Sequence, residues 1–137
     1  MPSPSDLRRV LILDVETGGL DPETDPLLEV AVAEYCVTRG LIAATSWLVH
    51  SRENRAFVVN GIPVELVSDE TATEHPGYTI KMLGDAAAGC QAVVAHNAAF
   101  DRRWFADLGL PWICTCDDVA WPKPSTTFGS NWVPLPA

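Results

Sequence analysis

Two carboxylates separated by one residue, Asp14 and Glu16, stand directly after an apolar run and directly before a glycine turn. Residues two apart on a strand project to the same side, so both acids are expected on one face at the end of a buried strand. Two carboxylates placed in this way repel each other unless a cation lies between them. The pair therefore predicts a divalent-metal site, although two solvated acids at the start of a loop would give the same short pattern.

A third acid, Asp101, ends the distant stretch His96-Asn97-Ala98-Ala99-Phe100-Asp101. It falls one helical turn after Asn97, at the start of a predicted helix that follows a short buried strand. An acid at that position lies near the positive end of the helix, and the strand beside it delivers Asp101 to the sheet edge where the first two acids lie. Three carboxylates from two distant segments are what two hard cations, Mg²⁺ or Mn²⁺, need to be held against a phosphate.

The first half of the chain predicts a meander of strands. Residues Val10–Val15 are apolar on both faces, which indicates a strand covered on each side. Apolar residues recur at every second position of residues 27–37, and the short Thr38-Arg39-Gly40 connection predicts that Leu41–Val49 returns antiparallel to them. Residues 51–76 are polar and irregular, and a connection of that length is usually functional or mobile.

The second half predicts helices and short strands. Residues 78–90 carry apolar positions at helical spacing, and Ala92–Ala95 is typical of a brief buried strand. A second helix is expected to begin at Asn97, which is able to cap it, and to bury a stripe formed by Phe100, Trp104 and Leu108.

The last part of the chain predicts one more strand and then no regular structure. The glycine and proline of Gly109-Leu110-Pro111 are expected to end the second helix, and Trp112–Val119 is the candidate final strand, which would contain Asp117 and Asp118. After Trp121 the sequence becomes rich in proline. We expect one domain over residues 1–137, with a core of about 8–122 and an extended, proline-rich tail at 123–137.

Composition narrows the classes of protein. No apolar run approaches the length that spans a bilayer, the N-terminus lacks the pattern of a secretory signal, and the four cysteines are too scattered for a disulfide framework. We therefore expect a cytoplasmic protein with reduced thiols. The net charge of −9 argues against a protein that coats nucleic acid, but it is compatible with an enzyme that grips one strand end.

Both acidic stretches resemble motifs of one family. Asp14-Val15-Glu16-Thr17-Gly18-Gly19-Leu20-Asp21-Pro22 is similar to the first motif of the DnaQ-like DEDD 3′-5′ exonucleases, and the stretch His96–Asp101 resembles their second, His-Asn-x-x-Phe-Asp. Asn60-Gly61-Ile62 lies between them and is similar to the family's His/Asn-Gly-Ile loop. The resemblance covers roughly Arg9 to Pro122 and points to the type that includes proofreading subunits. It implies an α/β, RNase H-like fold, with a mixed five-stranded sheet whose first three strands are antiparallel and which is flanked by helices.

The resemblance also implies roles for individual residues. Asp14, Glu16 and Asp101 would be the catalytic residues and the ligands of a two-metal site that holds Mg²⁺ or Mn²⁺. The substrate would be the 3′ end of a DNA or RNA strand, single-stranded or frayed, and the reaction would be hydrolysis of its last phosphodiester. The expected substrate-binding residues are Thr17 and Gly18 through their backbone, Leu20 and Ile62 against the last bases, Asn60 in the central loop, and Asn97, which would orient Asp101 or the substrate. His96 is expected to be structural.

The family's third motif is not found. It supplies a fourth carboxylate with a His or Tyr on a helix after the fifth strand, but no His or Tyr follows His96 in this chain. The acids after Asp107 are Asp117 and Asp118, which fall on the predicted final strand itself. We therefore expect the C-terminal helix to be lacking. The chain is a piece of a longer product, a second polypeptide completes the site, or the protein has kept the fold without the chemistry.

Without that helix, one face of the core is expected to stay uncovered. The apolar tail, a protein partner or self-association should cover it. The alternative function is a catalytically silent scaffold or interaction module in a larger nucleoprotein or viral assembly. The three acids favour the enzyme, because nothing else in the fold requires them to stay together, whereas the missing motif and the acidic charge favour the module.

Overall fold

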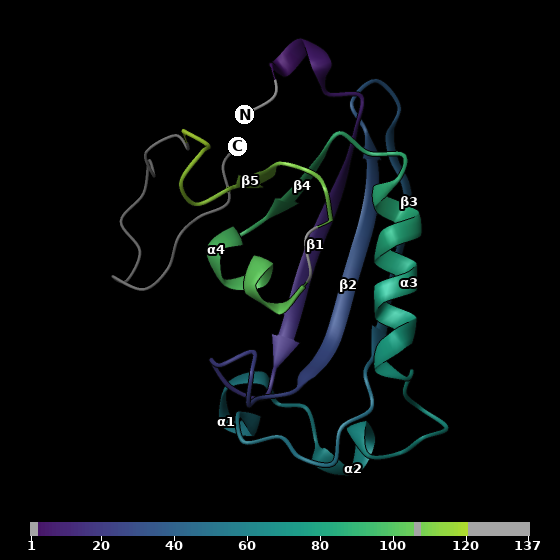
Figure 1. The fold of residues 1–137 in the computed structure, drawn as a ribbon, viewed down its shortest axis with the longest axis vertical. Coiled ribbons are helices and arrows are strands. Elements are labelled where there is room, and N and C mark those ends of the chain that lie inside the picture. The colour runs from purple at the N-terminus through teal and green to yellow at the C-terminus, as the bar shows by residue number, and fades with distance from the viewer. Residues whose placement is uncertain (1–2, 106–107, 121–137) are drawn as a thin grey trace, which may run out of the picture.

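The computed structural model describes residues 3–105 and 108–120; the predicted tail at 123–137 lies outside them. A single five-stranded sheet with the order β3-β2-β1-β4-β5 forms the centre (Figure 1). Strands β1, β2 and β3 pair antiparallel, whereas β4 pairs parallel with β1, and β5 pairs parallel with β4. The strands are β1 (Arg9–Thr17), β2 (Leu27–Cys36), β3 (Gly40–Leu48), β4 (Ala92–Ala95) and β5 (Trp112–Cys114). The predicted mixed sheet with three antiparallel strands first is confirmed.

The helices are short, with one exception. α3 (Pro76–Ala87) runs along β2 and β3 on one face of the sheet (Figure 1). The other helical segments are η1 (Pro4–Asp6), α1 (Phe57–Asn60), α2 (Val64–Val67), α4 (Ala98–Asp101) and η2 (Arg102–Trp104). No helix in residues 3–105 or 108–120 combines the length and the apolar character that a membrane crossing needs.

The core lies between the sheet and α3. Leu11, Leu13 and Val15 alternate along β1 and are buried against Leu83 of α3 and Trp47 of β3. Phe100, Trp104 and Phe105 pack against the same cluster. The period-two spacing of large apolar residues thus directs one face of β1 into a core that excludes water.

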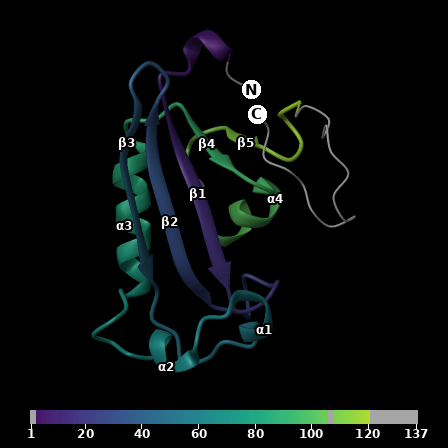
Figure 2. The ribbon, with the colours of Figure 1, turned by 180° about the vertical axis from the view of Figure 1, so that it is seen from behind.

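The other face of the sheet is open within the described residues. In the view from behind, β1, β2 and β3 lie in front of α3 without a helix over them (Figure 2). Ile12 is 40% exposed and Asp14 is exposed, although their neighbours Leu11 and Leu13 are almost fully buried. The prediction that β1 is covered on both faces is therefore wrong for the described residues, because no described segment crosses this face. The residues that line the shallow hollow there are Ile12, Asp14, Ala31, Val32, Ala33, Ala44, Thr45 and Ser46.

The second predicted helix is shorter than expected. α4 ends at Asp101 and η2 at Trp104, after which Phe105 is extended, with φ −125° and ψ 150°. Successive residues of a helix point about 100° apart, so the extended backbone at Phe105 lets Trp104 and Phe105 both pack on the core. Asn97 does not cap α4 through its side chain; its backbone is left-handed, with φ 59°.

The final strand is also shorter than predicted. β5 ends at Cys114, and the backbone N–H groups of Asp117 and Asp118 both donate to the Cys114 carbonyl, over 3.2 and 2.7 Å. The Asp118 carboxylate in turn accepts the Cys114 N–H over 2.7 Å. These bonds make a turn that an acidic side chain closes, so Asp117 and Asp118 lie beyond the strand and not on it.

Candidate active site

The carboxyl end of β1 carries the first pair of acids. Asp14 and Glu16 alternate with the buried Leu13 and Val15, so they share the open side of the strand, as predicted. Burial, followed by the negative charges of Asp14 and Glu29, raises the pKa of Glu16. Glu29 stands directly opposite Glu16 on β2. The sequence analysis missed Glu29, which could have been found by aligning the two strands as an antiparallel pair.

Asp101 is brought to the same place from α4. Its residue is only 3% exposed, and burial together with the negative charge of Asp14 raises its pKa to about 6. The charge of Glu16 acts in the same direction, whereas backbone N–H groups of Asp101 and Val15 hydrogen-bond to the carboxylate and oppose the shift. The structure therefore makes electrostatic neighbours of three acids that come from opposite halves of the sequence.

The three carboxylates do not yet surround one point. Within the described residues, no group of three His, Cys, Asp or Glu side chains is arranged so as to hold a metal ion. Asp14 is exposed, so its carboxylate has room to turn toward a cation. The donor set itself fits Mg²⁺ or Mn²⁺, because both ions prefer carboxylate oxygens and would relieve the repulsion that raises the pKa of Glu16 and Asp101.

The glycine turn after β1 is closed tightly. Thr17 Oγ1 donates to the Gly19 carbonyl over 2.7 Å, and the Gly18 N–H donates to the Pro26 carbonyl over 2.8 Å. A Cβ on Gly18 would lie 2.7 Å from the Pro26 ring, and one on Gly19 would overlap the Asp25 carboxylate. Any larger residue would therefore collide with the rigid Pro26 ring at position 18 and would have to displace the Asp25 side chain at position 19. The turn ends in Leu20, whose side chain is 76% exposed.

The loop around Asn60 meets this turn. β1 ends beside α1, which Asn60 terminates (Figure 1). The side-chain amide of Asn60 donates to the Thr17 carbonyl over 2.9 Å, and its oxygen accepts the N–H of Ile62 over 3.0 Å. Asn54 donates to the same oxygen over 2.9 Å. Thr17, Asn60 and Ile62, which were all predicted to contact substrate, are thus brought together; Asn54, which no sequence motif marked, supports them.

Asn97 is placed differently from the other predicted residues. It is exposed and its side chain makes no cap hydrogen bond. The hydrogen bonds that hold the Asp101 carboxylate come from backbone groups. The role of Asn97 in orienting Asp101 or the substrate stays a prediction.

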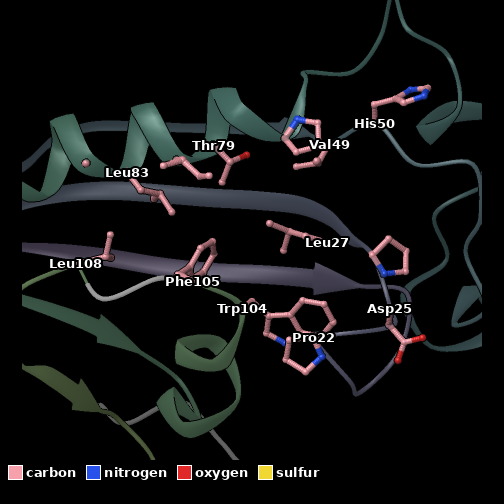
Figure 3. A pocket seen from close by; sticks show the side chains of 14 residues that line it. Pro22, Asp25, Leu27, Val49, His50, Thr79, Leu83, Trp104, Phe105 and Leu108 are labelled. Carbon is pink, nitrogen blue, oxygen red and sulfur yellow. The ribbon is translucent and has the colours of Figure 1, made fainter.

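A second hollow lies on the other side of the sheet. It is a cavity of about 540 Å³ between α3 and the segment that contains Trp104 and Phe105. Its lining is mostly apolar; Figure 3 shows Leu83 and Thr79 on α3 facing Trp104 and Pro22 across the strands. Asp25 is the acid in its lining. Because Asp14 and Glu16 project to the opposite face of β1, this cavity is separate from these two acids.

Comparison with curated proteins identifies nucleases. The chain is 33% identical to ribonuclease T of Blochmanniella pennsylvanica in an alignment of 111 residues that covers 69% of this chain and 50% of that protein. It is 35% identical to ribonuclease T of Shewanella denitrificans in an alignment of 107 residues that covers 66% of this chain and 47% of that protein. The chain therefore spans about half the length of these curated relatives. No family model matches it.

Solved exonuclease structures share the fold. Exonuclease X in complex with 5′-overhanging duplex DNA is 26% identical, with a TM-score of 0.56 over 77% of this chain and 59% of that one. Exonuclease I of E. coli in complex with a dT13 oligonucleotide has a TM-score of 0.62 at 13% identity, over 86% of this chain and 32% of that one. The second likeness concerns the fold alone, which is RNase H-like, as predicted.

Proposed function

We propose that this chain is a metal-dependent 3′-5′ exonuclease of the DnaQ-like family, which hydrolyses terminal phosphodiesters of DNA or RNA; its likeness to ribonuclease T and to exonuclease X supports the proposal. The proposed substrate is a 3′ end in a single strand or a frayed duplex. The main support for the proposal is the electrostatic repulsion at buried Asp101. The charges of Asp14 and Glu16, which lie more than 80 residues away in the sequence, raise the pKa of its carboxyl. A fold without metal chemistry gains nothing from that repulsion.

The proposed roles follow from where each group lies. Asp14, Glu16 and Asp101 would hold the cations. Bound cations would polarise the terminal phosphate, supply an activated water and stabilise the leaving 3′ oxygen. The backbone N–H of Val15 holds the Asp101 carboxylate in place. The carboxylates must be ionised to bind a cation, so binding a metal and releasing the Asp101 proton are linked.

The nucleotide would lie beside the turn after β1. Exposed Leu20 and half-buried Ile62 flank the end of β1 and offer apolar surface to the last bases. Asn60 hydrogen-bonds both to the Thr17 carbonyl and to the Ile62 N–H. The end of β1 and the loop that carries Ile62 are therefore linked before any substrate binds. Such preorganisation reduces the ordering cost of binding.

The test is release of the 3′-terminal nucleotide from a labelled single strand with Mn²⁺. Asp14→Ala is expected to lower the rate about a hundredfold or more, since a ligand of the cations that would act on the reacting phosphate is lost. Asp85→Ala removes one exposed acid from α3 and is the control that should keep the activity. If neither the unchanged protein nor the control releases nucleotide at high protein and metal concentration, the silent-module alternative is favoured.

We also propose that the open face of the sheet, defined by the residues that line its hollow, receives a further polypeptide, either a partner or a second copy. Ile12 and the alanines around it present apolar surface beside Asp14, so a segment there would also be next to the metal site. Ile12→Glu should abolish any association seen by light scattering, whereas Val37→Glu, on an exposed apolar residue beyond β2, should not. A monodisperse monomer whose solubility is unchanged when the tail is deleted would contradict this proposal. The cytoplasmic location and the single-domain boundaries stay predictions.

A further inference from the structure

Arg103 links the turn after β1 to the segment that carries Asp101. It lies in η2, two residues after Asp101, and its Nη2 donates to the main-chain carbonyl of Leu20 over 3.2 Å. The two residues are 83 positions apart in the sequence. No sequence motif or spacing rule indicates a contact between residues so far apart.

Among the described residues, the other hydrogen bonds of the turn do not connect Leu20, at its tip, to α4. The Asp21 N–H donates to the Asp25 carboxylate over 2.9 Å, and the Asp25 N–H donates to the Asp21 carbonyl over 2.7 Å. The Gly18 N–H donates to the carbonyl of Pro26, the residue before β2. These bonds close the turn on itself and on β2, but they do not set its distance from Asp101. The guanidinium of Arg103 does, because it spans from η2 to the residue at the tip.

We propose that Arg103 is a positioning residue for substrate. Its hydrogen bond to Leu20 would keep the apolar surface that contacts the terminal base at a fixed position relative to the metal-binding acids. The inference rests on the proposed function. A side chain as exposed as Leu20 has little packing to hold it, so the position of its apolar surface depends on its backbone. A hydrogen bond from a cation to a carbonyl is among the stronger restraints that an exposed turn can have.

A direct phosphate contact is the competing role, and Arg102 offers the matched control. Both arginines are exposed, carry the same charge and lie in η2. Hydrogen exchange of backbone amides in residues 18–26, measured on the free protein, separates the roles because it needs neither substrate nor activity. Arg103→Ala should speed exchange in this segment about tenfold, Arg103→Lys should restore part of the protection, and Arg102→Ala should leave exchange unchanged.

Nuclease kinetics supply the second measurement. With a labelled single strand and Mn²⁺, Arg103→Ala should raise KM about tenfold with kcat almost unchanged, because binding surface is displaced but the acids are not. Unchanged amide exchange in Arg103→Ala overturns the inference, whatever happens to KM. Faster exchange in a protein that is inactive without any substitution would keep the structural link while removing the proposed function, so the two failures are distinguishable.

Discussion

The side-chain amide of Asn60 donates to the main-chain carbonyl of Thr17 over 2.9 Å, which joins the loop between β3 and α3 to the last residue of β1. The oxygen of the same amide is occupied as well, by Ile62 N–H and the Asn54 amide. One side chain thus fixes two loops that approach the acids from different parts of the chain. The geometry of the candidate nucleotide site depends on it.

Replacing Asn60 should therefore affect both stability and substrate binding. Asn60→Ala removes several partly buried hydrogen bonds, and we expect a loss of about 1–3 kcal/mol in the free energy of unfolding. Asn60→Asp keeps the acceptor but loses the donor to Thr17, so it should be at least as damaging to KM. Urea unfolding and the single-strand assay measure the two effects. Ser46→Ala, on an exposed strand position, is the control; equal stability of Asn60→Ala and the unchanged protein would contradict the role.

Stability without metal should fall as pH rises. The ordinary pKa of an Asp, 3.8, is raised to about 6 at Asp101, so the folded state binds this proton more tightly than the unfolded state. The stabilisation is fully present below pH 3.8 and is lost as pH rises through 6; the shift corresponds to roughly 3 kcal/mol. Asp101→Asn cannot ionise, so unfolding in EDTA between pH 4 and 7.5 should show a smaller decline for this variant. Parallel profiles for both proteins would refute the assignment.

Removing a neighbouring charge should stabilise the metal-free protein. Asp14→Ala takes away the charge that, after burial, contributes most to raising the pKa of Asp101, so at neutral pH its melting temperature in EDTA should exceed that of the unchanged protein. Saturating Mn²⁺ should reverse the order, because binding at a hundred times Kd stabilises by about 2.7 kcal/mol and needs the acid. Thermal unfolding with and without Mn²⁺ checks both signs. An equal response to Mn²⁺ in both proteins would place any bound ion elsewhere.

Replacing Gly19 by alanine should weaken substrate binding, whereas replacing Gly84 by alanine should stabilise the protein. At Gly19 a Cβ would overlap the Asp25 carboxylate, so Gly19→Ala must displace Asp25 and break its bond to the Asp21 N–H, and KM should rise. Gly84 lies within α3 with nothing within 4 Å of a Cβ, so Gly84→Ala should raise the free energy of unfolding by about 0.5–1 kcal/mol. Circular dichroism melts and single-strand kinetics compare the two. A neutral Gly19→Ala would mean that the turn is not as tightly closed as the structure has it.

Local patterns were sufficient for much of the fold. The apolar run Val10–Val15 predicted a strand where β1 lies, and the short connection before Gly40 predicted the antiparallel return of β3. The stretches around Asp14 and His96 predicted the family and the fold. These features depend on residues that are close in sequence, where backbone geometry alone decides which side chains share a face.

Contacts between distant segments determined two features of the fold that local sequence patterns did not predict. Whether a helix continues past Asp101 depended on how Trp104 and Phe105 could both reach the core, and this overrode their helical spacing. Whether the second face of β1 is covered depended on which segments cross it, so Ile12 was apolar and yet exposed.

The sequence by itself determined the residue types of the candidate site: three acids, a glycine turn and an Asn-Gly-Ile loop, each recognisable because its chemistry needs particular side chains at short spacing. Only the tertiary structure decided that Asp101 is buried among like charges, that Glu29 faces Glu16, and that Asn60 donates to Thr17 and Arg103 to Leu20. Burial, charge coupling and hydrogen bonds across 43 or 83 residues are properties of the packed chain, because they arise only when separate segments share one space.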